Sequence, residues 1–261
     1  MLHPLNLPDY DGGVILVTDE LASPADYLLH KCLGDFLKGP ASTSRHGLSA
    51  LPGKDSNSQV VVVPVSEGLF RWKAIASRSN LNWDQMVGAG RIKIVEVSIS
   101  FAPQVLKSLF ESLVSMLDSS QDPPGQRVLV ILDDISTFQW VGFESLDIQR
   151  FLRALKALCT KTKATLVIRH HLVSREDNHG DELFGFLTQI CSYHIDVRAL
   201  SSGRSGAVSG EIAVYAGPST VIASQEMDLG VRLIQPGSAL QYRLTDTGAV
   251  FFEKGTSGGV L

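Results

Sequence analysis

Two acidic residues directly follow an apolar run, in an arrangement that ATP-hydrolysing proteins use to hold magnesium. Val128–Leu132 predicts a strand buried on both faces, and Asp133 and Asp134 come next. An acid at such a strand end helps to bind the magnesium that accompanies ATP. Strands also end in Asp because this side chain suits turns and helix caps. We interpret the pair as a degenerate Walker-B-like acid motif with a structural role; a relic of an ATP site is the alternative.

The turn after the first expected strand lacks the residues that bind phosphate. Val14–Thr18 predicts that strand, and the turn after it continues to Asp26. A phosphate-binding loop needs glycines, whose backbone N–H groups face the phosphates, and a lysine. This turn has neither; Pro24 removes one N–H donor, and acids such as Asp19 would repel a polyphosphate. We therefore expect no nucleotide, no other cofactor and no catalytic residues of the chain's own.

Basic and histidine side chains gather around the end of the fifth expected strand, Ala164–Ile168. Arg169 and His170 directly follow this strand, and Arg175 and His179 lie in the polar segment after it. One interpretation is a solvated loop. The other is a loop that contacts RNA phosphates, which would bind in a salt-sensitive and largely sequence-independent way.

Neither cysteine nor histidine spacing favours a metal site. Cys32, Cys159 and Cys191 are far apart, and no C-x-x-C pair exists. His170 and His171 are adjacent, so on a strand their side chains point to opposite faces. We expect no metal and three thiols in the core. Such sparse cysteine usage indicates a reducing compartment, so we expect a cytoplasmic location, with the nucleus as an additional one.

Strands and helices alternate over the first 190 residues, which predicts the scaffold for these side chains. A helix should begin near Ser23, with Ser23 as its cap and Pro24 at its first position. The other expected helices contain residues 70–76 or cover 103–117, 146–160 and 182–189, and the strands cover 14–18, 60–65, 92–97, 128–132 and 164–168.

After Ser192 the pattern consists mostly of strands, at 194–199, 211–215, 241–244 and 249–253, and Asp246-Thr247-Gly248 is a hairpin signal. Alternation predicts right-handed crossovers and a parallel sheet. The chain is thus expected to be one α/β domain over residues 1–261. Its mostly parallel sheet is flanked by helices, residues 192–261 form an antiparallel extension of that sheet, and residues 39–59 form a surface insertion.

Composition limits the functional classes. The chain has 261 residues and 44% hydrophobic residues, enough for one large core. A net charge of −4 is not typical of a dedicated nucleic-acid-binding domain. No apolar run reaches the length of a membrane span, and the N-terminal residues do not form a secretory signal.

Several segments resemble the Elongator complex protein 6 family. The members of this family are RecA-like subunits without a phosphate-binding loop. The resemblance rests most on the tail, Tyr242–Asp246, Val250–Gly255 and Val260–Leu261. It extends to Leu129–Ser136 and to the block from Val61, with Ser66, Trp72 and Ile75.

This resemblance implies a RecA-like fold and a subunit that is not an enzyme. It implies a ring of six chains formed with two related RecA-like subunits, the fourth and the fifth. Such a ring joins the catalytic Elongator subcomplex, which modifies the wobble uridine of tRNA, and it engages tRNA. The loops after the fourth and fifth strands, 135–144 and 170–181, would face the pore. The RNA-binding candidates Arg169, His170, Arg175 and His179 rest on this analogy.

The alternative function is a RecA-like ATPase with an unconventional phosphate site. The composition of the turn at 18–26 argues against it, and nucleotide binding by the isolated chain would test it. Whether Asp133 contributes to a neighbouring subunit's site stays open.

Overall fold

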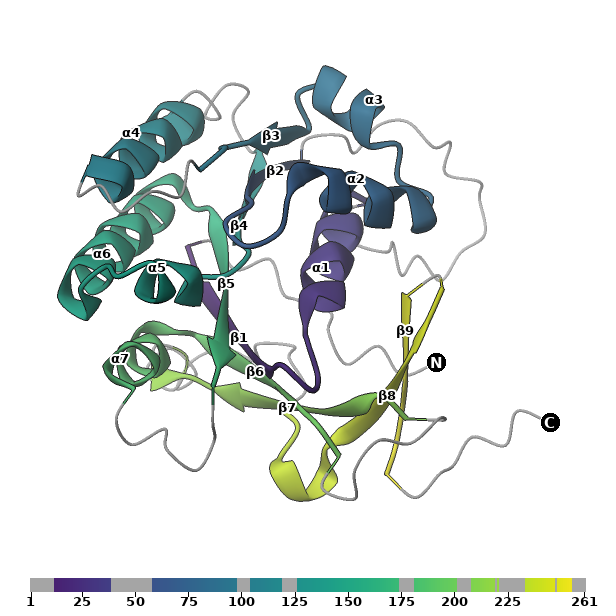
Figure 1. Cartoon of the computed structure of the whole chain (residues 1–261). Coiled ribbons are helices and arrows are strands. Elements are labelled where there is room, and N and C mark those ends of the chain that lie inside the picture. The colour runs from purple at the N-terminus through teal and green to yellow at the C-terminus, as the bar shows by residue number, and fades with distance from the viewer. Residues whose placement is uncertain are drawn as a thin grey trace.

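The computed structural model describes residues 12–38, 58–97, 104–118, 126–173, 181–200, 208–218, 220, 233–246 and 248–254. In these residues one nine-stranded sheet has the order β3-β2-β4-β5-β1-β6-β7-β8-β9 (Figure 1). Its strands are β1 Val14–Glu20, β2 Ser58–Val63, β3 Ile92–Ile94, β4 Arg127–Leu132, β5 Thr165–Leu172, β6 Tyr193–Arg198, β7 Gly210–Ala216, β8 Leu240–Thr245 and β9 Gly248–Phe252.

The sheet is parallel from β3 to β6 and antiparallel from β7 to β9. β1 pairs in parallel with both β5 and β6, whereas β7 runs antiparallel to β6, and β8 and β9 form a hairpin. The prediction of a mostly parallel sheet with an antiparallel C-terminal extension is confirmed. One detail differs, because β6, the first strand after Ser192, still pairs in parallel with β1.

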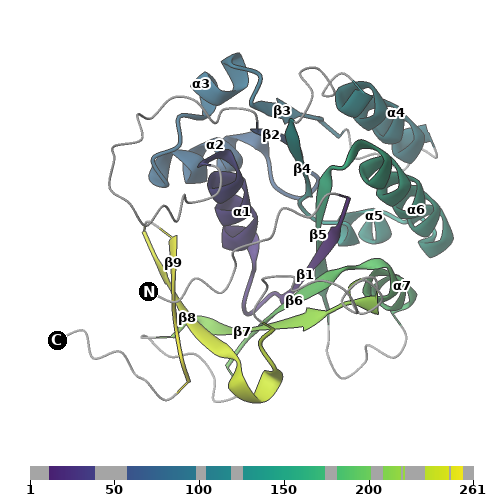
Figure 2. The same cartoon turned by 180° about the vertical axis from the view of Figure 1, so that it is seen from behind.

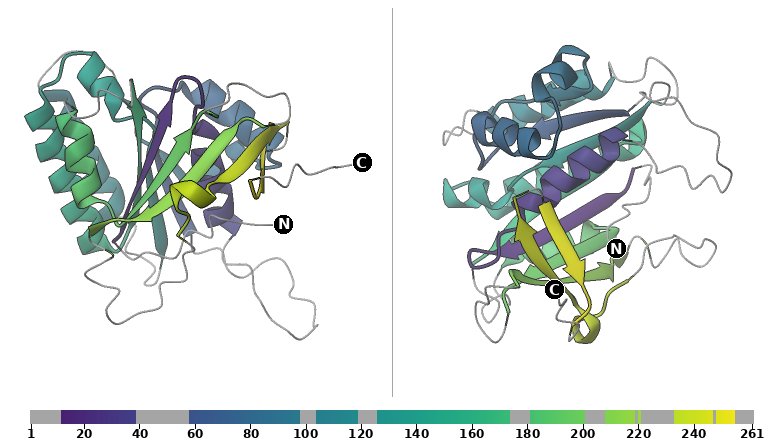
Figure 3. Two further views of the ribbon diagram at one scale, coloured as in Figure 1. Left: turned by 90° about the horizontal axis from the view of Figure 1, so that it is seen from below. Right: turned by 90° about the vertical axis from the view of Figure 1, so that its right-hand side faces the viewer.

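Helices cover both faces of the sheet, as Figures 2 and 3 show. One face carries α1 Asp26–Lys38, α2 Leu69–Arg78 and α3 Trp83–Gly88, and the other carries α4 Gln104–Asp118, α5 Ser136–Trp140, α6 Ser145–Thr162 and α7 Glu182–Ile190. Side chains alternate along the strands. In β1, Val14 and Leu16 pack under α4 to α7, and Ile15 and Val17 pack under α1 to α3.

Three local expectations needed correction. Ser58 and Gln59 are buried residues of β2, so the expected insertion ends earlier; its residues 39–57 lie outside the described part of the chain. The short helices α3 and α5 were not predicted, because one or two turns offer too little periodicity. β5 continues to Leu172, four residues past its expected end.

Candidate functional site

The sequence-predicted residues that the structure describes, Asp133, Asp134, Arg169 and His170, meet at the carboxyl edge of the parallel sheet. β1, β4 and β5 are parallel neighbours, so the residues that end or follow them share one edge. In the register of β1 with β5, Asp19 lies beside His171 and Val17 beside Arg169. In open α/β sheets this edge is where ligands usually bind.

Asp19 occupies the amino end of α1 with a buried carboxylate. Its Oδ2 accepts a hydrogen bond from the backbone N–H of Ala25 (2.6 Å) and lies 2.8 Å from Nη2 of Arg169. Its Oδ1 is 3.0 Å from Nδ1 of His171. Burial by itself would raise the pKa of Asp19, but the His171 hydrogen bond and the Arg169 charge together hold this pKa below its usual value. The helix end that attracts phosphate in other proteins is therefore satisfied by an internal anion.

Ser23 does not cap α1 as expected, because its side chain faces another part of the sheet. Its Oγ lies 2.7 Å from the hydroxyl of Tyr242 and donates to the backbone carbonyl of Arg198. The backbone amide at the start of α1 that Asp19 accepts from is that of Ala25, two residues after Ser23. Sequence spacing could not show this, because the cap comes from the preceding strand end.

Burial corrects the expectation that Arg169 and His170 present their side chains to RNA. The Arg169 side chain is 8% exposed and ion-paired with Asp19, and that of His170 is 1% exposed. Both follow an apolar run, but β5 continues through them, and a continuing central strand buries them. Arg175 and His179 lie outside the described residues, so their RNA contacts stay a prediction.

Asp133 holds the turn between β2 and α2. Its Oδ1 accepts from the backbone N–H groups of Val65 (2.6 Å) and Ser66 (3.0 Å), and its Oδ2 accepts from Glu67 N–H (3.1 Å) and the Trp72 indole (3.4 Å). Burial raises the pKa of Asp133 to about 6 although these four donors oppose the rise. With both oxygens engaged, the contacts support the structural role of this carboxylate.

Asp134 organises the start of α5. Its carboxylate accepts from the backbone N–H of Ser136 (2.9 Å) and from the hydroxyl of Thr137 (3.1 Å). No group of three or more His, Cys, Asp or Glu within the described ranges is arranged to hold a metal ion. All three cysteines are buried, and burial raises the pKa of Cys32 and Cys159 to about 12 and that of Cys191 to about 11.

A Ser–His–Asp array, which sequence reasoning missed, lies beside this edge. Ser136 Oγ is 2.9 Å from Nδ1 of His170, and Nε2 of the same ring is 2.9 Å from Oδ2 of Asp181. Ser136 is buried, and its Oγ also accepts from the backbone N–H of His171 (2.7 Å). Because the Ser136 hydroxyl is buried away from any substrate, we assign this array to the packing of α5 on β5.

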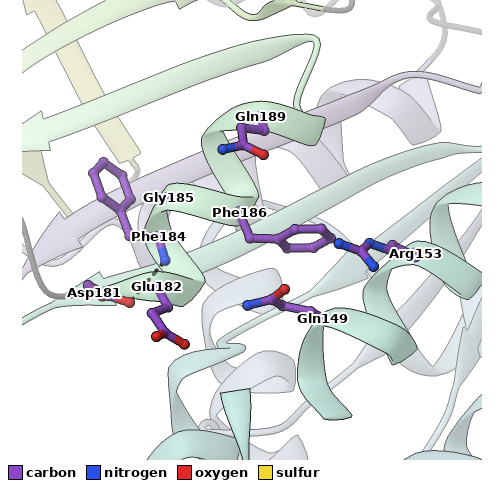
Figure 4. Close-up of a pocket in the computed structure, with 8 residues that line it drawn as sticks. All are labelled: Gln149, Arg153, Asp181, Glu182, Phe184, Gly185, Phe186 and Gln189. Carbon is purple, nitrogen blue, oxygen red and sulfur yellow. Dashed lines mark hydrogen bonds between the residues drawn. The ribbon is translucent and has the colours of Figure 1, made fainter. Parts of the chain in front are cut away.

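A depression of about 610 Å³ lies between α6 and α7 (Figure 4). The guanidinium of Arg153 lies over the ring of Phe186, 5.0 Å from its centroid. Asp181, on the rim, caps α7 by accepting from the backbone N–H of Phe184. Arg153 and Asp181 therefore serve helix packing and capping.

Large apolar side chains are exposed along the carboxyl edge, after four different strands. Leu21 follows β1, Phe70 opens α2 after β2, Trp140 and Leu146 follow β4, and Val173 follows β5. We call these five the carboxyl-edge residues. Phe70 is 86% exposed and Val173 85%, although most residues of their type are buried. Apolar groups placed this way around one edge are typical of a surface that a partner covers.

Sequence comparison relates the chain to one family. The model of the family described as Elongation complex protein 6 matches residues 92–245, more than half of the chain. Elongator complex protein 6 of Xenopus laevis is 27% identical over 161 residues, which cover 60% of this chain and 57% of that protein. The protein of the same name in Xenopus tropicalis is 28% identical over the same shares. The chain thus spans about 57% of the length of these relatives.

Two archaeal structures share the fold. A KaiC-like protein of Pyrococcus horikoshii has a TM-score of 0.59 at 11% identity, over 93% of this chain and 90% of that one. An uncharacterized protein of the same organism, solved with an unknown peptide, has a TM-score of 0.60 at 12% identity, over 94% and 93%. The predicted RecA-like α/β fold is thereby confirmed, and at these identities the likeness concerns the fold alone.

Proposed function

The chain belongs to the Elongation complex protein 6 family, and from this membership we propose that it is a non-catalytic, RecA-like subunit of an Elongator assembly. In this proposal it pairs with two related RecA-like subunits, the fourth and the fifth, in a ring of six chains. The ring supports the catalytic subcomplex that modifies wobble uridines of tRNA. Its proposed location is the cytoplasm, with the nucleus as a second location.

The observation that carries the non-catalytic part is the carboxylate of Asp19 at the amino end of α1. A nucleotide phosphate at this helix end would meet a fully buried negative charge that already takes the Ala25 amide and the Arg169 guanidinium. A phosphate that took these two partners would leave the Asp19 carboxylate buried and unpaired, which costs roughly 3–5 kcal/mol. This occupied helix end supports the proposal that the chain binds no ATP phosphate at the start of α1.

The carboxyl-edge residues support the assembly part. A second RecA-like subunit of similar shape would cover Phe70 and Val173, and burial of one such side chain contributes roughly 1.5–3 kcal/mol. No helix of the described ranges has the length and apolarity to cross a lipid bilayer. Apolar side chains gathered along one edge are typical of a protein–protein contact, so we assign the carboxyl-edge residues to a protein partner.

Native mass of the co-expressed subunits tests this function. We expect a complex with two copies of each of the three chains, and we expect Phe70→Asp to weaken it by placing a charge in the contact. Val87→Asp is the matched control, since Val87 is an exposed apolar residue of α3, which lies toward the opposite end of the strands. A chain that stays a monodisperse monomer beside the other two subunits would refute the assembly role.

Contact of the assembled ring with tRNA is the finer part of the proposal. Arg175 and His179 remain its candidate contacts. Replacing both with glutamine should weaken tRNA binding by the ring and lower its salt dependence, because phosphate contacts release counterions. Arg150→Gln, which removes an exposed cation paired with Asp147, serves as the control for loss of one positive charge. Equal tRNA affinity of the wild-type ring, the double variant and the Arg150→Gln ring would show that Arg175 and His179 do not contact tRNA.

The competing ATPase hypothesis has its own test. We expect calorimetry with Mg²⁺ and ATP to detect no binding by the isolated chain. Saturable micromolar binding that disappears in Asp133→Ala would instead favour an unconventional phosphate site. Since Asp133→Ala also frees three backbone amides, its fold must be verified by circular dichroism in the same experiment.

A further inference from the structure

A cavity of about 390 Å³ lies between α1, the end of α2 and the β8–β9 hairpin. The right-hand view of Figure 3 shows α1 between the blue helices and the yellow hairpin. Apolar side chains from all three elements line it, including Leu33, Ile75, Leu244 and Ala249. None of the carboxyl-edge residues contributes, so this cavity is separate from the proposed subunit contact. Its volume lies within the range of small-molecule sites, about 300–1,000 Å³.

Gly34 keeps one wall of this cavity open. It lies inside α1, where glycine costs about 1 kcal/mol relative to alanine. A Cβ atom built on Gly34 would have no heavy atom within 4 Å, so neither packing nor backbone conformation requires glycine here. The residue lines the cavity. Because Gly34 has no side chain, the part of the cavity beside it stays open to a ligand.

His30, one helical turn before Gly34, lines the same wall of the cavity. Its side chain is largely buried and lies against Trp72, with ring centroids 4.2 Å apart. Its Nδ1 is buried and has no hydrogen-bond partner among the described residues. Burial lowers the pKa of His30 to about 4, so at neutral pH the ring is uncharged and offers one donor and one acceptor nitrogen.

The rim of the cavity carries an excess of positive charge. Lys31 is paired with Asp35 at 2.7 Å. Within the described ranges neither Lys38 nor Arg78, which also line the cavity, forms an ion pair, and Asp246 is the remaining acid of the rim. Two cations against one acid favour an anionic group at the mouth.

We propose that this cavity is a binding site for a small amphipathic anion with an apolar, ring-sized body and a single acidic group. The body would fill the space beside Gly34, next to His30, and the acidic group would lie at the rim near Lys38 and Arg78. The proposal stands apart from the subunit role, since it uses other residues and can be tested on the full chain alone.

Titration of the full chain with 8-anilinonaphthalene-1-sulfonate tests this site, because the probe joins aromatic rings to one sulfonate. We expect saturable binding of one equivalent. Gly34→Leu should place a side chain in the cavity and weaken binding about tenfold or more, while the helix is retained because leucine favours helices. Gly185→Leu is the matched control, since Gly185 is a glycine inside α7 whose Cβ direction is equally open.

Two further measurements separate this site from other apolar surface. The double variant Lys38→Gln, Arg78→Gln should weaken sulfonate binding and flatten its salt dependence, and it should leave the affinity for neutral N-phenyl-1-naphthylamine unchanged. Probe bound at the carboxyl-edge residues would be insensitive to Gly34→Leu. Binding that is unaltered in Gly34→Leu, or the lack of any saturable binding, overturns the proposal.

Discussion

The guanidinium of Arg169 and the carboxylate of Asp19 form a buried ion pair, with Nε and Nη2 at 2.9 and 2.8 Å from the same oxygen, Oδ2. The pair joins the ends of β5 and β1 at the amino end of α1. An internal carboxylate thus takes the place, at this helix end, that a phosphate takes in proteins that bind phosphate at a helix amino end.

Asp19→Ala should destabilise the chain strongly, because it leaves the Arg169 charge and the Ala25 amide buried without their partner. We expect a loss of about 3–5 kcal/mol in the free energy of unfolding, measured by urea denaturation. Sulfate or phosphate should stabilise this variant more than the wild type, since either anion can enter the vacated position.

Asp35→Ala is the control for this variant, because Asp35 forms an exposed i,i+4 pair with Lys31. Its loss should cost at most about 1 kcal/mol, and its response to sulfate should equal that of the wild type. A response of Asp19→Ala that also equals that of the wild type would count against the phosphate-like role of Asp19.

Asp133 should make the chain less stable as pH rises from about 4 to 6. Its pKa is raised to about 6 in the folded chain, above a value of 3.8 for the unfolded chain. Between these two pKa values the folded state binds more protons than the unfolded state. The contribution of Asp133 to the free energy of unfolding is therefore complete below about pH 4 and is lost as the carboxyl ionises in the folded chain. The change is roughly 3 kcal/mol.

Asp133→Asn should remove this component of the pH dependence. It should also lower stability at every pH, because an amide offers one acceptor oxygen to the four donors that Asp133 satisfies. Urea denaturation from pH 4 to 7 measures both effects. The same slope in wild type and variant would show that Asp133 does not titrate in this range.

Ser136→Ala should cost about 1–3 kcal/mol, because it leaves Nδ1 of His170 and the backbone N–H of His171 without their buried partner. Ser112→Ala is the control, since the Ser112 hydroxyl is exposed on α4 and donates to the Ser108 carbonyl of the preceding turn; the loss should stay within about 0.5 kcal/mol. Thermal unfolding of the two variants makes the comparison. Equal stability would show that the Ser–His–Asp array contributes nothing to packing.

Gly210→Ala should destabilise the C-terminal part of the sheet. A Cβ at this position would lie 2.5 Å from the carbonyl oxygen of Arg198, 2.6 Å from Ser23 Oγ and 2.8 Å from the Tyr242 hydroxyl. Overpacking of this kind costs about 1–3 kcal/mol. Gly34→Ala, where the Cβ meets nothing, should be neutral or stabilising by up to about 1 kcal/mol. A Gly210→Ala chain as stable as wild type would contradict this close approach.

The alternation of elements was readable from local pattern. Buried parallel strands are continuous apolar runs, so Val128–Leu132 was identified within one residue of β4. The absent phosphate loop was equally plain, because glycine and lysine are needed at set positions of one short turn. The hairpin at Asp246–Gly248 was found for the same reason, since turn chemistry is local.

Only the tertiary structure decided which polar side chains are buried and which partners they contact. Sequence placed Arg169 and His170 at a strand end, where solvent exposure was a reasonable expectation. Their burial follows from β5 lying between β4 and β1, a neighbour relation that spans about 150 residues of chain. Asp19 caps α1 in place of Ser23 for a similar reason: Tyr242, over 200 residues away, takes the Ser23 hydroxyl. Periodicity and turn signals reach a few residues, whereas partners of buried charges come from any part of the sheet.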